Sequence, residues 1–481
     1  MSRTFRPWKI DEPLLLPAVV GEFVAKDHLA GFVLNLIRDE VELVEIVASY
    51  GGERGQPPFD PTMMTALLLY SYCCGIYASR RIAKACRERV DFMSIVGFDA
   101  PDFRTISDFR KRHLHALGKL FGQILRLCEK AGLVKLGHVA LDGTKIKANA
   151  SKHKAMSYAR MEKRAAELDA EVARWLSTAA AADAEEDRLH GSDKTGEEMP
   201  EWVADKMQRA AKIRAARAEL EAEAKAAAEA KLKAAAEAAE KREAEGRHRG
   251  GRKAAPPSTA PDAKAQKNFT DPDSRIMKSK DGFVQAYNAQ IAVDGAAQVI
   301  VAQDVTQSPV DSGQLVPLID AVKTNLGRHP DQASADAGYC SEANLEALEN
   351  RAIDGYVATG RARDAVVGHR EHGDDDAPGA PAPQAASMPA EPPPAPAPTR
   401  VEAMRAKIMA GGHTSPYRLR KQLPEPVFGQ IKQARGFRQF LLRGYTQVRA
   451  EWAIICTAHN LLKLANGGSL SAALPSAAAA A

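Results

Sequence analysis

The sequence predicts an α/β protein, in which a mixed β-sheet with flanking helices follows an all-helical region and is interrupted by a helical insertion. Three observations lead to this prediction. Residues 1–134 repeat apolar side chains at helical spacing. Short apolar segments with strand character begin only after residue 135, and helix-like segments alternate with most of them. Residues 158–265 have an Ala-, Glu-, Lys- and Arg-rich composition that favours helix.

Residues 1–134 are expected to form a helical DNA-binding domain. Asp60 and Pro61 provide an N-cap and a first helical position for one helix, and a longer helix is expected over Thr105–Ala131. Basic side chains cluster on the expected helix surfaces: Arg80, Arg81, Lys84, Arg87, Arg110, Lys111 and Arg112. Short basic helices before a long one are typical of helix-turn-helix DNA binding. The alternative is a solvated basic face without a partner.

The sheet is expected to begin in residues 135–157 and to continue in residues 266–360. The first strand, HVALD, ends at Asp142, although Asp142 and Gly143 could also form a simple turn. Two further strands form a hairpin, Asp311 caps a helix, and a short strand ends at Asp336. Without the insertion, this order of strands and helices is the layout of a ribonuclease-H-like fold.

The remaining segments are assigned from their composition. Residues 158–265 contain two helix-forming stretches with too few apolar residues for a sustained heptad seam, so we expect a helical hairpin and a linker outside the core. Residues 361–414 are rich in Pro and Ala and are expected to be a disordered linker. Residues 415–465 return to the sheet domain as C-terminal helices, and residues 466–481 form a disordered tail.

Three acidic residues are placed to form a metal site. Asp142 and Asp336 each end a predicted strand, and Glu425 lies between two prolines, where a helix is expected to begin at Pro426. Unpaired backbone N–H groups at that helix start keep a carboxylate ionised. Two aspartates and a helix-borne glutamate provide the hard oxygen ligands that Mg²⁺ prefers. The alternative is that Glu425 only begins a helix.

Bulk composition narrows the class of protein. The formal net charge of +5 and the pI of about 8.7 are compatible with a nucleic-acid partner. The six cysteines form no CxxC pair, which indicates reduced thiols rather than a disulfide framework or a zinc site. No stretch reaches the ~18 apolar residues that a membrane span requires. We therefore expect a cytoplasmic protein with no membrane partner.

Five segments of the chain resemble bacterial insertion-sequence transposases of the DDE superfamily, in particular the IS-five-like group of the IS-eleven-eighty-two type. They are FDPTMMTALLLY, PDFRTISDFRKRH, ALDGTKIKANASKHKAMSY, NFTDPDSRIMKSKDGFVQAYNAQIAVD, and EPVFGQIKQARGFRQFLLRG continuing through EWAIICTAHNLLKLA. Together with ADAGYCSE they cover most of the chain outside the insertion, the proline-rich linker and the tail.

The resemblance implies a metal-dependent enzyme that cleaves DNA and transfers strands at the ends of an insertion sequence. Asp142, Asp336 and Glu425 match the three catalytic carboxylates, which would hold two Mg²⁺ or Mn²⁺ ions. The implied partners are terminal inverted repeats and target DNA, bound by a homodimer that assembles on DNA at the bacterial nucleoid.

The resemblance also implies DNA contacts beside the third acid. Such transposases carry a tyrosine, arginine, glutamate, lysine signature, which Tyr417, Glu425 and Lys432 match. Arg420 keeps the spacing from the tyrosine and Lys421 keeps the spacing to the glutamate, so both are candidates for the basic position. Lys432 is expected to contact a DNA phosphate.

Three functions remain open at this point. The first is an active transposase. The second is a domesticated transposase-derived DNA-binding protein, or a ribonuclease-H-like nuclease without strand transfer. The third is a structural DNA-binding protein with degenerate acids, against which the three intact acids argue.

Overall fold

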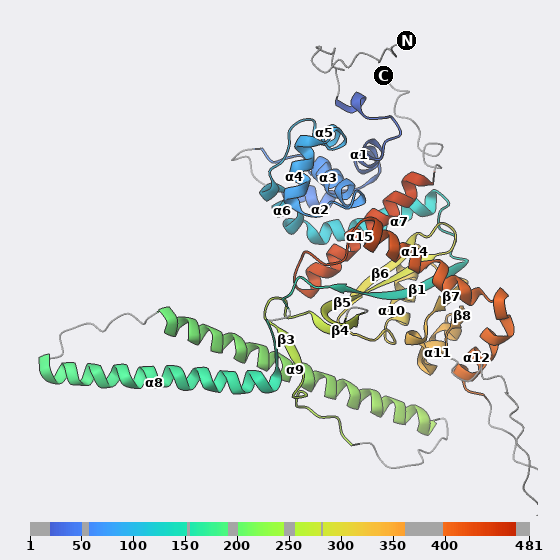
Figure 1. Ribbon diagram of the computed structural model, residues 1–481. Coiled ribbons are helices and arrows are strands. Elements are labelled where there is room, and N and C mark those ends of the chain that lie inside the picture. The colour runs from blue at the N-terminus through green and yellow to red at the C-terminus, as the bar shows by residue number, and fades with distance from the viewer. Residues whose placement is uncertain are drawn as a thin grey trace, which may run out of the picture.

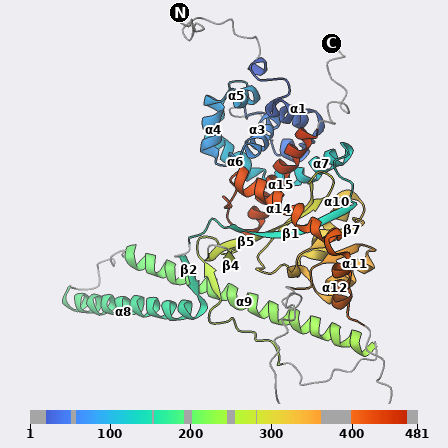
Figure 2. The same cartoon turned by 45° about the vertical axis from the view of Figure 1, so that its right-hand side comes forward.

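The computed structural model describes residues 20–50, 57–151, 154–190, 201–244, 255–279, 282–360 and 398–467. A mixed sheet lies at the centre and a helical region packs above it; of two long helices below, one projects to the left and the other continues beneath the sheet (Figure 1). The same arrangement is seen in the turned view (Figure 2). No helix in these ranges is long and apolar enough to cross a membrane. Each of the six cysteines is a free thiol.

The central sheet has six strands, with β5 as its longest member. They are β1 (His138–Lys147), β4 (Arg275–Ser279), β5 (Gly282–Asp294), β6 (Ile300–Thr306), β7 (Gln332–Ala335) and β8 (Asp354–Val357). The order is β4-β5-β1-β7-β8, and β6 also pairs with β5. β5 is antiparallel to β1, whereas β1, β7 and β8 run parallel to one another. The predicted mixed sheet is therefore confirmed.

β1 does not end at Asp142 as predicted. It continues to Lys147, because β5 is long enough to pair with it from Asp294 to Ala286. Asp142 is paired with Ile291, so the Asp-Gly dipeptide lies within the ladder and forms no turn. Its parallel neighbour β7 is shorter and stops at Ala335. Asp142 therefore still lies at the level where β7 ends.

Helices cover both faces of the sheet (Figure 1). Below it lies α10 (Leu315–Leu326), and above it lie α14 (Pro424–Gly429) and α15 (Tyr445–Asn466). α11 (Glu342–Asn350) contacts α10 and β8. His459 of α15 is buried, and its imidazole contacts the Gln298 carbonyl and the Arg435 guanidinium. Burial lowers the pKa of His459 to about 3, as suits a neutral core histidine.

Over residues 20–50 and 57–134, the N-terminal region is helical, as predicted. It contains η1 (Val20–Phe23), α1 (Leu29–Glu40), α2 (Val44–Ala48), α3 (Pro61–Cys73), α4 (Ser79–Glu88), α5 (Val90–Val96), α6 (Phe103–Arg112) and α7 (Leu114–Lys130). The single helix predicted over residues 105–131 is two helices, interrupted at His113, whose ring contacts the Tyr50 hydroxyl at 3.2 Å.

The helical region shares one core with the sheet domain. α15 packs against α3, α7 and β6, and one cluster of buried apolar residues runs from Ala30 to Leu464. The Cys128 thiol, for example, donates to the carbonyl of Asn460. The predicted boundary at residue 134 therefore does not separate two independent cores.

The arm comprises α8 (Tyr158–His190) and α9 (Glu201–Ala244). At its base, β2 (Ala155–Ser157) pairs with β3 (Gln266–Asn268) in a separate two-stranded sheet. The helices pack together through a small core of their own: Met161, Ala165, Leu168, Ala210, Ile213, Ala216 and Leu220. This core is separate from the main cluster, which places the arm outside the body of the sheet domain.

The prediction of a disordered linker over residues 361–414 is wrong at its C-terminal end. Residues 400–411 form α12, whose start is fixed by a capping box between Thr399 and Glu402. Arg400 pairs with Glu349, which attaches α12 to α11. Composition misled here because the capping and ion-pair partners lie outside the Pro-rich tract. Residues 361–397, and the tail from residue 468, lie outside the described ranges.

Candidate active site

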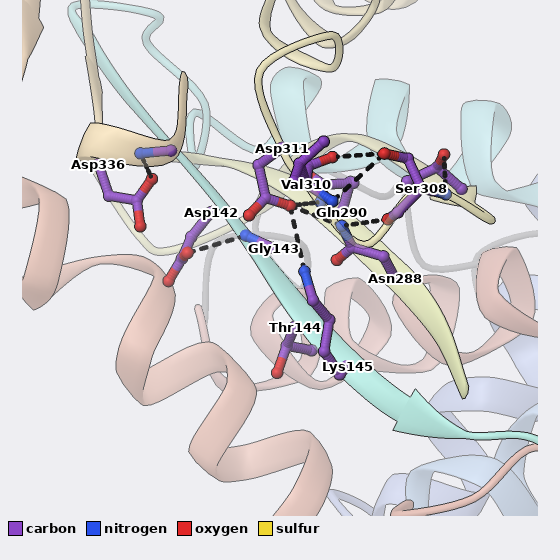
Figure 3. A network of polar contacts seen from close by, with 12 residues as sticks. Asp142, Gly143, Thr144, Lys145, Asn288, Gln290, Ser308, Val310, Asp311 and Asp336 are labelled. Carbon is purple, nitrogen blue, oxygen red and sulfur yellow. Dashed lines mark hydrogen bonds and ion pairs between the residues drawn. The ribbon is translucent and has the colours of Figure 1, made fainter. Parts of the chain in front are cut away.

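Asp142 and Asp336 lie on neighbouring parallel strands at the same level. Ala140 of β1 pairs with Ser334 of β7, so each aspartate stands two residues beyond a paired position. Each carboxylate is oriented by a backbone amide close to it in the sequence. Asp142 Oδ1 accepts from the Gly143 amide at 2.8 Å, and Asp336 Oδ1 accepts from the Gly338 amide at 2.9 Å (Figure 3). No hydrogen bond to the second oxygen of either group is found in the described ranges, although Asp336 Oδ2 lies near the Arg420 guanidinium.

The environment of Asp142 opposes its ionisation. Burial raises its pKa to about 6, and the charges of Asp336 and Asp311 act in the same direction. The Gly143 amide and the Arg420 guanidinium oppose this rise. Burial and the neighbouring acids thus disfavour the ionised form of Asp142. A cation bound beside the carboxylate would stabilise that form.

Arg420 lies at this acidic pair. It belongs to α13 (Leu419–Gln422), and its Nη2 is 3.6 Å from Asp336 Oδ2. Lys421, the other candidate for the signature position, is exposed, and no carboxylate contact is recorded for it in the described ranges. Tyr417 lies in a short 3₁₀ turn, Pro416–Arg418, which contacts β7 and β8. The structure thus brings Arg420, and not Lys421, to the acids.

Glu425 lies in the first turn of α14, which begins at Pro424 rather than at Pro426 as predicted. Glu425 is helical although Pro426 follows it. α14 packs on β1 and β5 through buried Val427 and Phe428. The Glu425 side chain is exposed, and no contact joins it to Asp142 or Asp336 in the described structure.

Lys432 reaches the site strand. Its Nζ donates to Thr144 Oγ1 and, at 3.1 Å, to the Lys145 carbonyl. Thr144 is two residues beyond Asp142, so both side chains point to the same face of β1. Lys432 lies in a π-helical turn, Gln430–Ala434. The direction of its side chain relative to Glu425 therefore does not follow regular α-helical spacing. Within the chain, Lys432 is held by β1.

A further carboxylate, Asp311, was expected only as a helix cap. α10 instead begins after Gln314, and Asp311 turns towards the sheet, where Asn288, Gln290 and Lys145 contact it (Figure 3). Asn288 and Gln290 are buried polar residues of β5, and the residues on either side of each in the strand are apolar. That pattern is the sequence signal that could have identified this cluster.

The two aspartates fit a divalent cation. Each offers an oriented carboxylate oxygen, a hard ligand, and Mg²⁺ keeps several waters, so two carboxylates suffice alongside a phosphate. Arg420 beside Asp336 shows that positive charge is accommodated there. Among the described residues, no group of three or more His, Cys, Asp or Glu side chains is already arranged to hold a metal. A third protein ligand would require Glu425 to approach the pair.

A basic surface, which we call the α4 surface, lies on the helical region. It consists of the exposed side chains Arg80, Arg81, Lys84 and Arg87 of α4. The Arg80 guanidinium lies 5.0 Å from the Phe103 ring centroid and Arg104 packs on the same ring, so α6 extends this surface. Lys111 and Arg112 are also exposed, as predicted.

Arg110 is not on the basic surface, which corrects its prediction as a DNA contact. Its side chain is buried and donates to the Tyr77 carbonyl at 2.7 Å and to Ser79 Oγ at 3.2 Å. It follows Ile106 by four residues and so shares that residue's buried face of α6. Arg110 therefore joins α6 to the start of α4.

Arg110→Ala is expected to lower the free energy of unfolding by about 3 kcal/mol, because buried hydrogen-bond acceptors lose a charged donor. The buried Glu451, whose pKa burial raises to about 7, would also lose the opposing charge of Arg110. Urea unfolding followed by circular dichroism measures the change. Arg112→Ala, at an exposed neighbouring position, should change stability little. An equal effect of both substitutions would contradict the assigned role of Arg110.

Comparison with known proteins adds three matches to protein-family models. A model described as a transposase domain (DUF772) matches residues 18–112. Models described as transposase DDE domains match residues 255–377 and 396–465. Asp336 and Glu425 lie within the two DDE segments, whereas Asp142 lies between matched segments. Neither the search of curated proteins nor that of solved structures found a match.

Proposed function

We propose that this chain, which carries transposase domains of the DDE type, cleaves DNA at the ends of an insertion sequence and joins those ends to target DNA. The observation that carries the proposal is the placement of Asp142 and Asp336 in register on adjacent parallel strands. A DDE domain implies a ribonuclease-H-like fold, and the mixed sheet with flanking helices found here agrees with the fold class expected from the sequence. Within the insertion-sequence transposases, we assign the chain to the IS-five-like group of the IS-eleven-eighty-two type on the sequence resemblance alone.

In this proposal Asp142, Asp336 and Glu425 hold Mg²⁺ or Mn²⁺, two ions in the active complex. Bound cations would neutralise charge on the scissile phosphate and generate a nucleophile at neutral pH. Asp142 and Asp336 supply oriented ligands. Glu425 would complete the set from α14, which packs on the same strand. Arg420 and Lys432 supply positive charge on either side of the pair, and Tyr417 lies in the turn before Arg420.

The α4 surface would bind the DNA ends, with Lys111 and Arg112 beside it and with exposed Lys421 of α13 as a further contact. The partners are the terminal inverted repeats and the target, and resemblance to insertion-sequence transposases supports a homodimer assembled on paired ends. A DNA substrate of this kind places the protein at the bacterial nucleoid.

The direct test is incubation of the full chain with DNA that carries the element's ends, in Mg²⁺ and in EDTA. We expect metal-dependent breaks that leave 3′-hydroxyl ends, followed by joining to a target plasmid. Sequencing of end-labelled products measures both steps. Binding without breaks would favour the domesticated DNA-binding alternative. Breaks without joining would favour a nuclease.

Reversal of charge on the α4 surface is expected to weaken the salt dependence of DNA binding. Each lost phosphate contact should reduce the slope of log K against log salt by about 0.9, so Arg80→Glu with Arg81→Glu should reduce it by roughly 1.8. Fluorescence anisotropy of the full chain measures this, because the helical region shares its core with the sheet domain.

Two exposed bases of the same region that already pair with acids provide the matched control. Arg38 pairs with Asp39, and Lys119 pairs with Glu45. Their reversal to Glu should leave the slope nearly unchanged. If both double variants behave alike, DNA binding does not depend on the α4 surface.

A further inference from the structure

Asp311 occupies a braced position between β6 and α10. The preceding loop is held by Ser308, whose hydroxyl donates to the Val310 carbonyl at 2.9 Å. The Ser308 carbonyl accepts from Asn288 Nδ2 at 3.2 Å, which attaches the loop to β5. Asp311 is therefore fixed against the sheet and not displayed on a free loop end.

One oxygen of Asp311 is saturated with donors. Oδ1 accepts from Asn288 Nδ2 at 2.6 Å and from Gln290 Nε2 at 2.8 Å, and Lys145 Nζ lies at 3.4 Å. Gly143 makes this possible, because a Cβ there would lie 2.2 Å from Gln290 Nε2 and 2.9 Å from Asp311 Oδ1. The missing side chain next to Asp142 thus lets Asp311 approach β1 from the opposite face (Figure 3).

The other oxygen of Asp311 faces the aspartate pair. A Cβ built on Gly338 would lie 3.4 Å from Asp311 Oδ2 and 3.0 Å from Asp336 Oδ1, so these two oxygens are at most about 6.4 Å apart. Asn288 Oδ1 is fully buried and has no hydrogen-bond donor within the described ranges. Acceptor oxygens are therefore in excess on this side of the site.

We propose that Asp311 is an auxiliary carboxylate that acts through its charge to increase the affinity of Asp142 and Asp336 for a divalent cation. It is a positioning residue, not a required ligand, because its Oδ1 is already contacted by three donors and no contact joins its carboxylate to Asp142 or Asp336 in the described structure. Lys145 opposes it by partly neutralising the charge. The inference rests on the metal-dependent function proposed above and assigns a role that the three acids of the resemblance do not include.

Two substitutions change this charge in opposite directions. Asp311→Asn keeps an acceptor for Asn288 and Gln290 and removes the charge, so Mn²⁺ should bind about tenfold more weakly or worse. Lys145→Gln leaves Asp311 in place and removes the ammonium charge that partly neutralises it, so Mn²⁺ should bind more tightly. Electron paramagnetic resonance of free Mn²⁺, titrated with the full chain, measures both affinities without any DNA cleavage. Opposite shifts are not expected from a purely structural role.

Asp320→Asn provides the matched control, because Asp320 of α10 pairs with Arg351 and touches neither aspartate of the site. It should leave Mn²⁺ affinity unchanged. If wild-type binding depends on Asp142 but Asp311→Asn and Lys145→Gln bind like wild type, the role of Asp311 is overturned alone. If Asp311→Asn does not fold, an unchanged affinity in Lys145→Gln still overturns it. Wild-type binding that is insensitive to Asp142→Asn would overturn the metal site as well.

Discussion

Asp142→Asn and Asp336→Asn are each expected to reduce DNA cleavage by on the order of a thousandfold or more, while DNA ends still bind. Metal ions contribute several kcal/mol of transition-state stabilisation, and each 1.36 kcal/mol is a factor of ten in rate. Asparagine keeps an oxygen for the Gly143 or Gly338 amide and loses the charge that holds a cation. Single-turnover cleavage at saturating DNA measures the rate, and anisotropy measures binding.

The control for this pair is Asp304→Asn. Asp304 lies on β6 and pairs with Arg449, away from the acids. Its substitution should leave the cleavage rate close to that of the wild type. Full cleavage by Asp336→Asn would remove that residue from the catalytic set.

Lys432→Met is expected to slow cleavage by about ten- to a hundredfold at saturating DNA, with a smaller change in end binding. Its Nζ lies on Thr144, on the face of β1 that carries Asp142, where a phosphate next to the scissile bond would pass. A hydrogen bond to a charged group contributes about 1.5–3 kcal/mol, which sets this range. The measurement is the single-turnover rate, together with the melting temperature.

Lys323→Met is the matched control, since Lys323 is exposed on α10, on the other face of the sheet. Lys432→Arg should recover part of the rate, because it keeps a positive charge. A cleavage rate in Lys432→Met equal to that in Lys323→Met would reduce Lys432 to a structural contact with β1.

The order of most strands and helices could be predicted because it depends on local periodicity, but β4 was not expected. The sequence of β5 alternates larger apolar residues with polar or small ones. The helices of the N-terminal region have caps and apolar residues that are visible in the sequence. The end of β1 could not be predicted, because Asp142-Gly143 favours a turn locally and only pairing with distant β5 keeps it extended. Tertiary pairing overrode a local preference.

The site was partly predictable for a similar reason. Asp142 and Asp336 were found because each stands at the end of a strand that the sequence predicts. Asp311 was assigned a local role, since its partners Asn288 and Gln290 are donated by another strand. Arg110 looked like a surface base because charge alone was counted, although its spacing from Ile106 places it on the buried face. In each case a contact distant in sequence decided the role.

The length of its helices sets how far the arm extends from the sheet domain. The two ends of the arm are paired at β2 and β3. The central sheet therefore does not depend on the length of the segment between them. At 1.5 Å per residue, the 33 residues of α8 extend about 50 Å, the length of roughly 15 base pairs of DNA. A change of one helical turn in that excursion would move its tip by about 5.4 Å and leave every strand of the sheet in register. Length, more than composition, is therefore the property through which this segment can be tuned independently of the chemistry.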